Sequence, residues 1–191
     1  MEKYFESFKS QKLQEEMLSS QDIFKGKILD VKMDTVRLPN GKTATRELIR
    51  HIGAVCIVAV TEDDEVIVEH QYRYPFDEVV VEIPAGKLDS KNEDPADAEE
   101  RELMEETGVT AGDMTYMGKF YPTCGYSDEV IHMYLAKNLS FGDRNLDDDE
   151  FLDVRAVPIE SLVEDIMAGK IPDGKTQAAV MRAYYMIKDR K

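Results

Sequence analysis

Residues 93–109 read EDPADAEERELMEETGV, and this stretch predicts a helix crowded with acids. Asp94 can serve as the N-cap, and Pro95 suits the first helical position, where no backbone N–H is needed. Alanine, glutamate, leucine and methionine fill the interior and are good helix formers. Gly108 supplies the left-handed residue that commonly ends a helix. The helix is therefore bounded by a clear signal at each end.

The acids of this helix are close enough to repel one another. With 100° of rotation per residue, Glu102 and Glu106 share a face, flanked by Glu99 and Glu105. Each like-charge pair costs roughly 0.2–0.5 kcal/mol, which a bound Mg²⁺ would offset because it prefers carboxylate oxygens. The alternative is a solvated acidic face, unsurprising in a chain with 39 acids and 24 bases. The stripe expected to face the core consists of Leu103, Ala96 and Thr107.

Composition limits the classes of function. A chain of 191 residues with 42% hydrophobic content can form one substantial domain, or a domain with an appendage. A net charge of −15 argues against a nucleic-acid partner but not against a small phosphorylated substrate. Two cysteines give no disulfide framework, the polar N-terminus lacks a signal-peptide core, and no apolar run suits a membrane span. We therefore expect a soluble, cytoplasmic protein with no membrane partner.

Hydrophobic patterning predicts an α/β (α+β) fold, in which a mixed sheet is covered by helices. Asn40-Gly41 suits the tight turn of a β-hairpin near the N-terminus. Residues 1–45 are expected to form an added piece with a helix and strands, and residues 46–191 the main domain. Strands are expected at 53–60, 66–74, 78–86, 113–121, 129–137 and 151–157, and further helices at 4–18, 159–168 and 174–188.

The segment from Gly86 through Glu93 to RELMEETGV (101–109) resembles the Nudix box. That pattern is Gly-x5-Glu-x7-Arg-Glu-U-x-Glu-Glu-x-Gly-U, where U is a bulky aliphatic residue. Every signature position from Glu93 to Val109 matches, but six residues, rather than five, separate Gly86 from Glu93. The extra residue lies before the helix, so it changes the loop and leaves the spacing of the later glutamates intact.

Four further segments narrow the resemblance to the ADP-ribose pyrophosphatase branch of the Nudix hydrolases. They are QYRYP (71–75), EIPAGKLD (82–89), PTCGYSDEVIHMYLA (122–136) and DDDEFLDV (147–154). The resemblance implies a Nudix-type mixed sheet between helices, with residues 46–191 as the hydrolase domain and residues 1–45 as a dimerisation extension. It also implies a homodimer that uses Mg²⁺, with Mn²⁺ as a possible substitute, to hydrolyse ADP-ribose to AMP and ribose 5-phosphate.

The helix and the preceding loop supply the expected metal ligands. Glu102 and Glu106, one turn apart, are the first choice, and Glu105 belongs to the same cluster. By resemblance, the backbone carbonyl of Ala85 is another ligand. Arg101 lies four residues before Glu105 and can pair with it, which would orient the carboxylate. The alternative for Arg101 is a surface ion pair of little energetic value.

A general base is also required, because a water molecule must be activated to split a pyrophosphate. Members of this branch take the base from a flexible loop far along the chain from the box. Here that loop is 140–150, in which Glu150 is the first candidate and Asp148 the second. Either residue could equally be part of a solvated acidic loop.

Residues for substrate binding come from three other segments. Arg73, at a strand end, could bind phosphates through its planar guanidinium, or form a structural ion pair. By family pattern, Glu82 could reach a ribose or base edge, and Glu129 the distal sugar or a metal. Tyr72 and Phe76 could stack on adenine, although aromatic residues beside a strand more often belong to the core.

Three other functions remain open from the sequence. The same chemistry could act on another nucleoside diphosphate sugar, such as GDP-mannose, or on a dinucleotide. A non-catalytic Nudix-fold module could bind a nucleotide, although it would not need a strained cluster of glutamates. An acidic protein-interaction domain would leave the box spacing as a coincidence.

Overall fold

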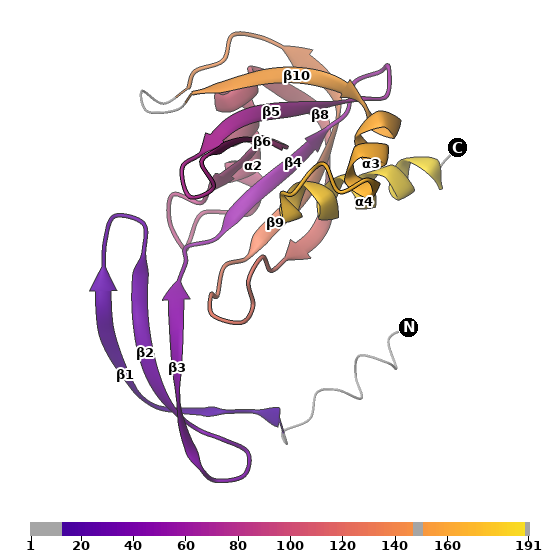
Figure 1. The fold of residues 1–191 in the computed structure, drawn as a ribbon. Coiled ribbons are helices and arrows are strands. Elements are labelled where there is room, and N and C mark those ends of the chain that lie inside the picture. The colour runs from indigo at the N-terminus through magenta and orange to yellow at the C-terminus, as the bar shows by residue number, and fades with distance from the viewer. Residues whose placement is uncertain (1–12, 147–150, 190–191) are drawn as a thin grey trace. The chain divides into compact units, whose positions relative to one another are not determined.

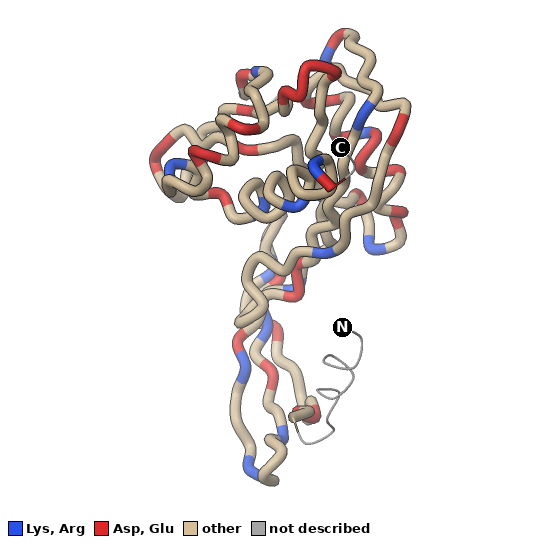
Figure 2. Tube along the Cα trace, turned by 90° about the vertical axis from the view of Figure 1, so that its right-hand side faces the viewer, with Lys and Arg blue, Asp and Glu red and all other residues tan. Residues whose placement is uncertain are grey.

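The computed structural model describes residues 13–146 and 151–189, which belong to two compact units (Figure 1). The N-terminal unit extends to His51 and includes the distant segment Thr123–Asp128. The larger unit comprises Ile52–Pro122 and the chain from Glu129 onward. Acidic residues are spread along the traces of both units (Figure 2).

The N-terminal unit contains a three-stranded antiparallel sheet of order β1-β2-β3. Its hairpin turn is at Asn40-Gly41 as predicted, with Gly41 at a φ of 82°. The helix predicted at 4–18 lies partly outside the described residues, and at 16–18 it is wrong. Those residues pair with β2, so the sheet overrides the local helix preference. The strands are β1 (Glu16–Lys25), β2 (Asp30–Arg37) and β3 (Thr43–Arg50).

The segment Thr123–Asp128 joins this unit by hydrogen bonds to the end of β3. Ile49 N donates to Tyr126 O at 2.8 Å, and the Asp128 carboxylate accepts from His51 N at 2.7 Å. Arg50 forms an ion pair with the same carboxylate at 3.1 Å. The unit therefore extends to His51, beyond the position 45 expected from the sequence.

The larger unit contains two sheets, of order β7-β4-β9-β8 and β10-β5-β6. The first sheet is mixed, because β4 and β9 are parallel while its other pairs are antiparallel. The strands are β4 (Ala54–Ala59), β5 (Glu65–Arg73), β6 (Glu78–Glu82), β7 (Ala85–Lys87), β8 (Val109–Phe120), β9 (Ile131–Phe141) and β10 (Leu152–Pro158). The helices described are α2 (Pro95–Thr107), α3 (Ile159–Met167) and α4 (Gly174–Lys188).

Strand β4 is buried on both faces and organises the core. Because side chains alternate along a strand, Val55 and Ile57 pack in a cluster with Leu103 of α2, whereas Cys56 and Val58 pack in a cluster that includes α3 and α4. Helices therefore cover both faces of the mixed sheet (Figure 1), which confirms the predicted fold class. Within the described chain, no helix is both long enough and apolar enough to span a membrane.

Helix α2 begins and ends as predicted. The Asp94 side chain accepts from Ala96 N, and Gly108 closes the helix at a φ of 72°. The predicted core stripe is only partly correct, because Leu103 is buried, Thr107 is half-buried and Ala96 is exposed. The buried residues are Ala98, Glu99, Leu103 and Glu106.

Candidate active site

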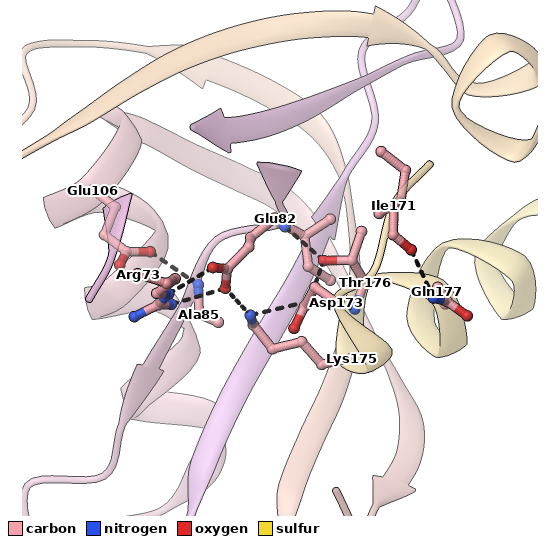
Figure 3. A network of polar contacts seen from close by, with 10 residues as sticks. Arg73, Glu82, Ala85, Glu106, Ile171, Asp173, Lys175, Thr176 and Gln177 are labelled. Carbon is pink, nitrogen blue, oxygen red and sulfur yellow. Dashed lines mark hydrogen bonds and ion pairs between the residues drawn. The ribbon is translucent and has the colours of Figure 1, made fainter. Parts of the chain in front are cut away.

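One buried glutamate of α2, Glu106, contacts the start of the short strand β7. Glu106 is only 4% exposed, and its Oε2 accepts a hydrogen bond from Ala85 N at 2.9 Å (Figure 3). Two residues that lie 21 positions apart in the chain, both predicted as metal ligands, are thereby brought into contact.

A glycine is required at the next residue of β7, Gly86, because another side chain approaches it closely. A Cβ at this position would overlap the carboxylate group of Glu102. Gly86 is not among the glycines with a left-handed backbone, so the constraint is space and not φ. The loop and the acidic face of α2 therefore fit together because position 86 has no side chain.

Arg101 connects the glutamates of α2 to the preceding loop. Its Nη1 donates to Glu102 at 2.7 Å and to Glu105 at 3.3 Å. Its Nη2 donates to Glu93 and to the Lys87 carbonyl, each at 3.3 Å. Partial burial lowers the pKa of Arg101, but the hydrogen bond and charge of Glu102 outweigh this and raise the pKa above its usual value. The predicted pairing with Glu105 is present, and the contact with Glu102 is shorter.

A second polar group adjoins this cluster. Arg73 donates from Nε and Nη2 to the two oxygens of Glu82, at 2.6 and 2.8 Å, and Lys175 bonds to the same carboxylate (Figure 3). Glu82 is 4% exposed. Burial tends to raise the pKa of Glu82, but the hydrogen bond from Arg73 and the charge of Lys175 lower it below its usual value. The Arg73–Glu82 pair is thus held in its charged form.

Most of the chain matches known families in two consecutive parts. Residues 50–182 match the NUDIX domain, and residues 15–49 match the nucleoside diphosphate sugar hydrolase N-terminal domain. The chain belongs to the Nudix family. The first match spans the glutamates of α2, Gly86 and Arg73.

Individual relatives of this Nudix protein cover nearly its full length. It is 40% identical over 179 residues to an ADP-ribose pyrophosphatase of Bacillus subtilis (strain 168), covering 93% of this chain and 95% of the relative. It is also 40% identical over 169 residues to a methanol dehydrogenase activator of Bacillus methanolicus, covering 87% and 91%. A solved structure described as an ADP compounds hydrolase covers 95% of this chain and 98% of its own, with a TM-score of 0.83. Its 22% identity supports the fold alone.

The donors of the Nudix box fit a hard divalent ion in their chemistry. Glu102, Glu105, Glu106 and the Ala85 carbonyl offer oxygen atoms, which Mg²⁺ and Mn²⁺ prefer. Among the described residues, however, no three acidic, histidine or cysteine side chains are gathered as a metal site. Arg101 and the backbone N–H of Ala85 hold the carboxylates instead. To bind one cation together, these carboxylates would have to rotate away from Arg101 and from the backbone N–H of Ala85.

Other residues expected in the site are placed less directly. Tyr72 neighbours Arg73 on β5, and its side chain therefore lies on the opposite face of the strand. It is 51% exposed, and its hydroxyl donates to Asp77 at 2.6 Å. Glu129 is half-buried directly before β9. Both remain predictions as substrate-binding residues.

The two candidates for the base, Glu150 and Asp148, lie outside the described residues. The chain that leads to them is hydrogen bonded to the end of α2. Asn145 N donates to the Glu105 carbonyl at 3.0 Å, and Gly142 N donates to the Gly108 carbonyl at 2.8 Å. The described start of this loop is thus fixed beside the acidic helix.

Sequence reasoning missed two charged residues of the site, Lys175 and Asp173. Both lie more than 60 residues after the box, at the beginning of α4. A local role explains the sequence DGKT (173–176), because Asp173 is a favourable residue for a helix N-cap. No spacing rule links it to the box.

One buried acid of α2, Glu99, is a source of instability. It is 2% exposed, and its Oε2 has no hydrogen-bond partner within the described residues. Burial, with a contribution from the charge of Glu100, raises the pKa of Glu99 to about 7 from an ordinary 4.5. The folded state therefore holds this proton more tightly than the unfolded state, and stability falls as pH rises from 4.5 to 7.

We expect Glu99→Gln to increase the free energy of unfolding at pH 8 by about 1–2 kcal/mol, because glutamine carries no charge to desolvate. The gain should shrink to near zero at about pH 3, below the ordinary pKa of 4.5, where Glu99 is protonated in both states. Urea denaturation at the two pH values, in EDTA, measures it. The exposed neighbour Glu100 provides a control, since Glu100→Gln should give a clearly smaller gain. An equal gain at both pH values would contradict the assignment.

Proposed function

We propose that this Nudix protein hydrolyses the pyrophosphate bond of ADP-ribose to give AMP and ribose 5-phosphate, with Mg²⁺ as cofactor and Mn²⁺ as a possible substitute. The proposal is supported by the contact of two glutamates of α2, Glu102 and Glu106, with Gly86 and Ala85 of β7. The substrate follows from the 40% identity with an ADP-ribose pyrophosphatase over nearly the full length of both chains.

The residues of the chain have distinct parts in this reaction. The cation is held by the carboxylates of Glu102, Glu105 and Glu106 and by the Ala85 carbonyl. Arg101 orients Glu102 and Glu105 before the cation binds. When bound, a divalent ion supplies Lewis-acid stabilisation of phosphate charge and makes water easier to deprotonate. The guanidinium of Arg73 binds a phosphate oxygen, because its fork geometry matches phosphate.

A carboxylate of the loop 147–150 acts as the general base. The water oxygen bonds to one phosphorus, the bond from that phosphorus to the bridging oxygen breaks, and the base takes the proton of water. Glu150 is the first candidate and Asp148 the second. The described residues on either side of this loop support the role. Before the loop, Asn145 is hydrogen bonded to the end of α2, and after it, Leu152 of β10 pairs with Gln71, two residues before Arg73.

A homodimer is the proposed assembly, in which the N-terminal unit forms the interface. Every residue of β1 is exposed, including large apolar side chains that seldom remain open in a monomer. A mass near 21.8 kDa by light scattering would contradict the dimer. The free thiols Cys56 and Cys124 agree with the cytoplasm as its location. The exposed apolar residues of β1 are Met17, Leu18, Ile23 and Phe24, and Ile28 and Leu29 follow shortly after the strand.

The function is tested with purified protein and a panel of ADP-ribose, GDP-mannose, NADH, diadenosine polyphosphate and dATP. We expect the highest kcat/KM for ADP-ribose with Mg²⁺, equimolar AMP and ribose 5-phosphate as products, and no turnover in EDTA. Restoring Mg²⁺ after EDTA should restore activity.

Two outcomes would change the proposal in different ways. A higher kcat/KM for GDP-mannose or a dinucleotide would replace the substrate and keep the chemistry. Binding of ADP-ribose without turnover of any substrate would favour a non-catalytic nucleotide-binding module.

A further inference from the structure

Two cations share one buried carboxylate beside the Nudix box. Arg73 occupies both oxygens of Glu82, and Lys175 bonds to Oε2 as well (Figure 3). The Lys175 side chain is 11% exposed and that of Glu82 is 5% exposed, so water screens the pair weakly. A bidentate arginine already balances the single negative charge of a carboxylate, and the second cation therefore calls for an explanation.

The position of Lys175 is fixed by the start of α4. Asp173 caps this helix and accepts from Thr176 N at 2.9 Å, from Thr176 Oγ1 at 2.6 Å and from Lys175 Nζ at 3.1 Å. The fully buried Thr176 hydroxyl in turn accepts from Ile83 N at 3.0 Å, directly after β6. Lys175 is thus held against the strand that carries Glu82.

The other side of this network adjoins the Nudix box. Figure 3 shows Arg73 next to Ala85 and Glu106, while Lys175 lies on the α4 side of Glu82. The hydrogen bond and charge of Glu82 raise the pKa of Arg73 above its usual value in spite of partial burial, and the charges of Asp173 and Glu106 add to this, in agreement with that proximity. Arg73 is therefore positioned between the Glu82 carboxylate and the place where the glutamates of α2 would hold a cation and its phosphate.

The charges explain why a second cation is useful. If Arg73 were the sole partner of Glu82, the charge of Arg73 would be cancelled by that carboxylate. Turning Arg73 toward a phosphate would then leave the buried Glu82 carboxylate without a partner, which is costly. Lys175 keeps Glu82 neutralised during such a movement. The carboxylate of Asp173, the remaining acid, accepts from the backbone N–H and the hydroxyl of Thr176 as well as from Lys175, and it lies at the positive end of the α4 dipole.

We propose that Lys175 is a positioning residue, which keeps Glu82 in place and neutralised so that Arg73 can bind the pyrophosphate of the substrate. This inference rests on the proposed function, and it extends the site to α4. Lys175 acts through Arg73 and does not take part in the chemical step. Its loss should therefore weaken substrate binding and leave turnover at saturation nearly intact.

The test compares Lys175→Met with Lys175→Arg in ADP-ribose hydrolysis at saturating Mg²⁺. Lys175→Met should raise KM about tenfold, the scale of one lost contact to a charged group, with a much smaller change in kcat. Lys175→Arg should restore most of the KM. The matched control is Lys170→Met, which removes an exposed lysine paired with Asp165 and should behave as wild type.

A double-mutant cycle with Arg73→Met separates positioning from a general structural effect. Because Lys175 acts through Arg73, Lys175→Met should raise KM little further once Arg73 is absent. Calorimetric titration with AMP should show the same pattern in Kd, and thermal unfolding identifies any variant that does not fold. If folding prevents the use of Lys175→Met, the cycle is run with Lys175→Gln.

The outcomes distinguish this inference from the proposed function. A wild-type enzyme that cleaves ADP-ribose, with an unchanged KM in Lys175→Met, overturns the role of Lys175 alone. An equal increase in KM with and without Arg73 also overturns it. A wild-type protein that cleaves no substrate of the panel overturns both proposals.

Discussion

Glu106→Gln is expected to lower kcat for ADP-ribose by roughly 10²–10³-fold, the scale seen when one electrostatic contributor is removed from an active site. Glutamine has nearly the same shape as glutamate, and its carbonyl oxygen can still accept the hydrogen bond that Ala85 N gives to Glu106. The fold should therefore survive, while an anionic ligand for the cation is lost. Steady-state kinetics, calorimetric Mg²⁺ titration and thermal unfolding measure the three consequences.

The matched control is Glu100→Gln, which removes the same charge from an exposed position of α2 and should leave kcat unchanged. Glu150→Gln gives a second comparison, because loss of the proposed base should lower kcat while Mg²⁺ affinity is retained. Full activity of Glu106→Gln would remove the basis of the proposed chemistry. Unaltered turnover of Glu150→Gln would assign the base to another acid, with Asp148 next.

Gly86→Ala should lower kcat/KM about 100-fold, because a misplacement of about 1 Å in a catalytic group can have that effect. The added methyl group would overlap the Glu102 carboxylate, which lies at the end of a flexible side chain. The backbone at position 86 is compatible with alanine, so we expect Glu102 to move and the fold to persist. Kinetics and Mg²⁺ titration should show a lower affinity for the cation, with little change in Tm.

Gly174→Ala is the corresponding control. Position 174 also has an ordinary backbone, and its added Cβ would meet Phe120 at 3.5 Å, a normal packing distance. This variant should retain wild-type kcat/KM. Normal activity of Gly86→Ala would show that the close approach of Glu102 to the loop has no catalytic importance, and a large loss of Tm would show that the loop cannot adjust.

Local signals predicted the element that carries the site. Asp94 and Gly108 end α2 as expected, because capping depends on hydrogen bonds between residues close in sequence. The face of α2 that is buried was predicted less well. Ala96 is exposed and Glu99 is buried, because the packing of α2 on the sheet, and not hydrophobicity alone, decides which face turns inward.

The extra residue between Gly86 and Glu93 shows how tertiary contacts absorb a change in spacing. Glu93 still reaches Arg101, and its carboxylate also accepts a hydrogen bond from the loop at Asp89 N. Arg101 contacts Glu102 and Glu105 at the same time. The contacts of Glu93 with Arg101 and of Glu102 with Gly86 therefore form with the extra residue in the loop.

The sequence by itself determined the family, the helix of glutamates, the glycine that faces it and the alternation of strands and helices. Each depends on spacing along a short segment, where backbone geometry fixes which side chains share a face. Only the tertiary structure joined Thr123–Asp128 to β3 and brought Lys175 to Glu82, 93 residues away. Such contacts form because distant elements pack on a common sheet, and no local periodicity in the chain records which polar groups will meet there.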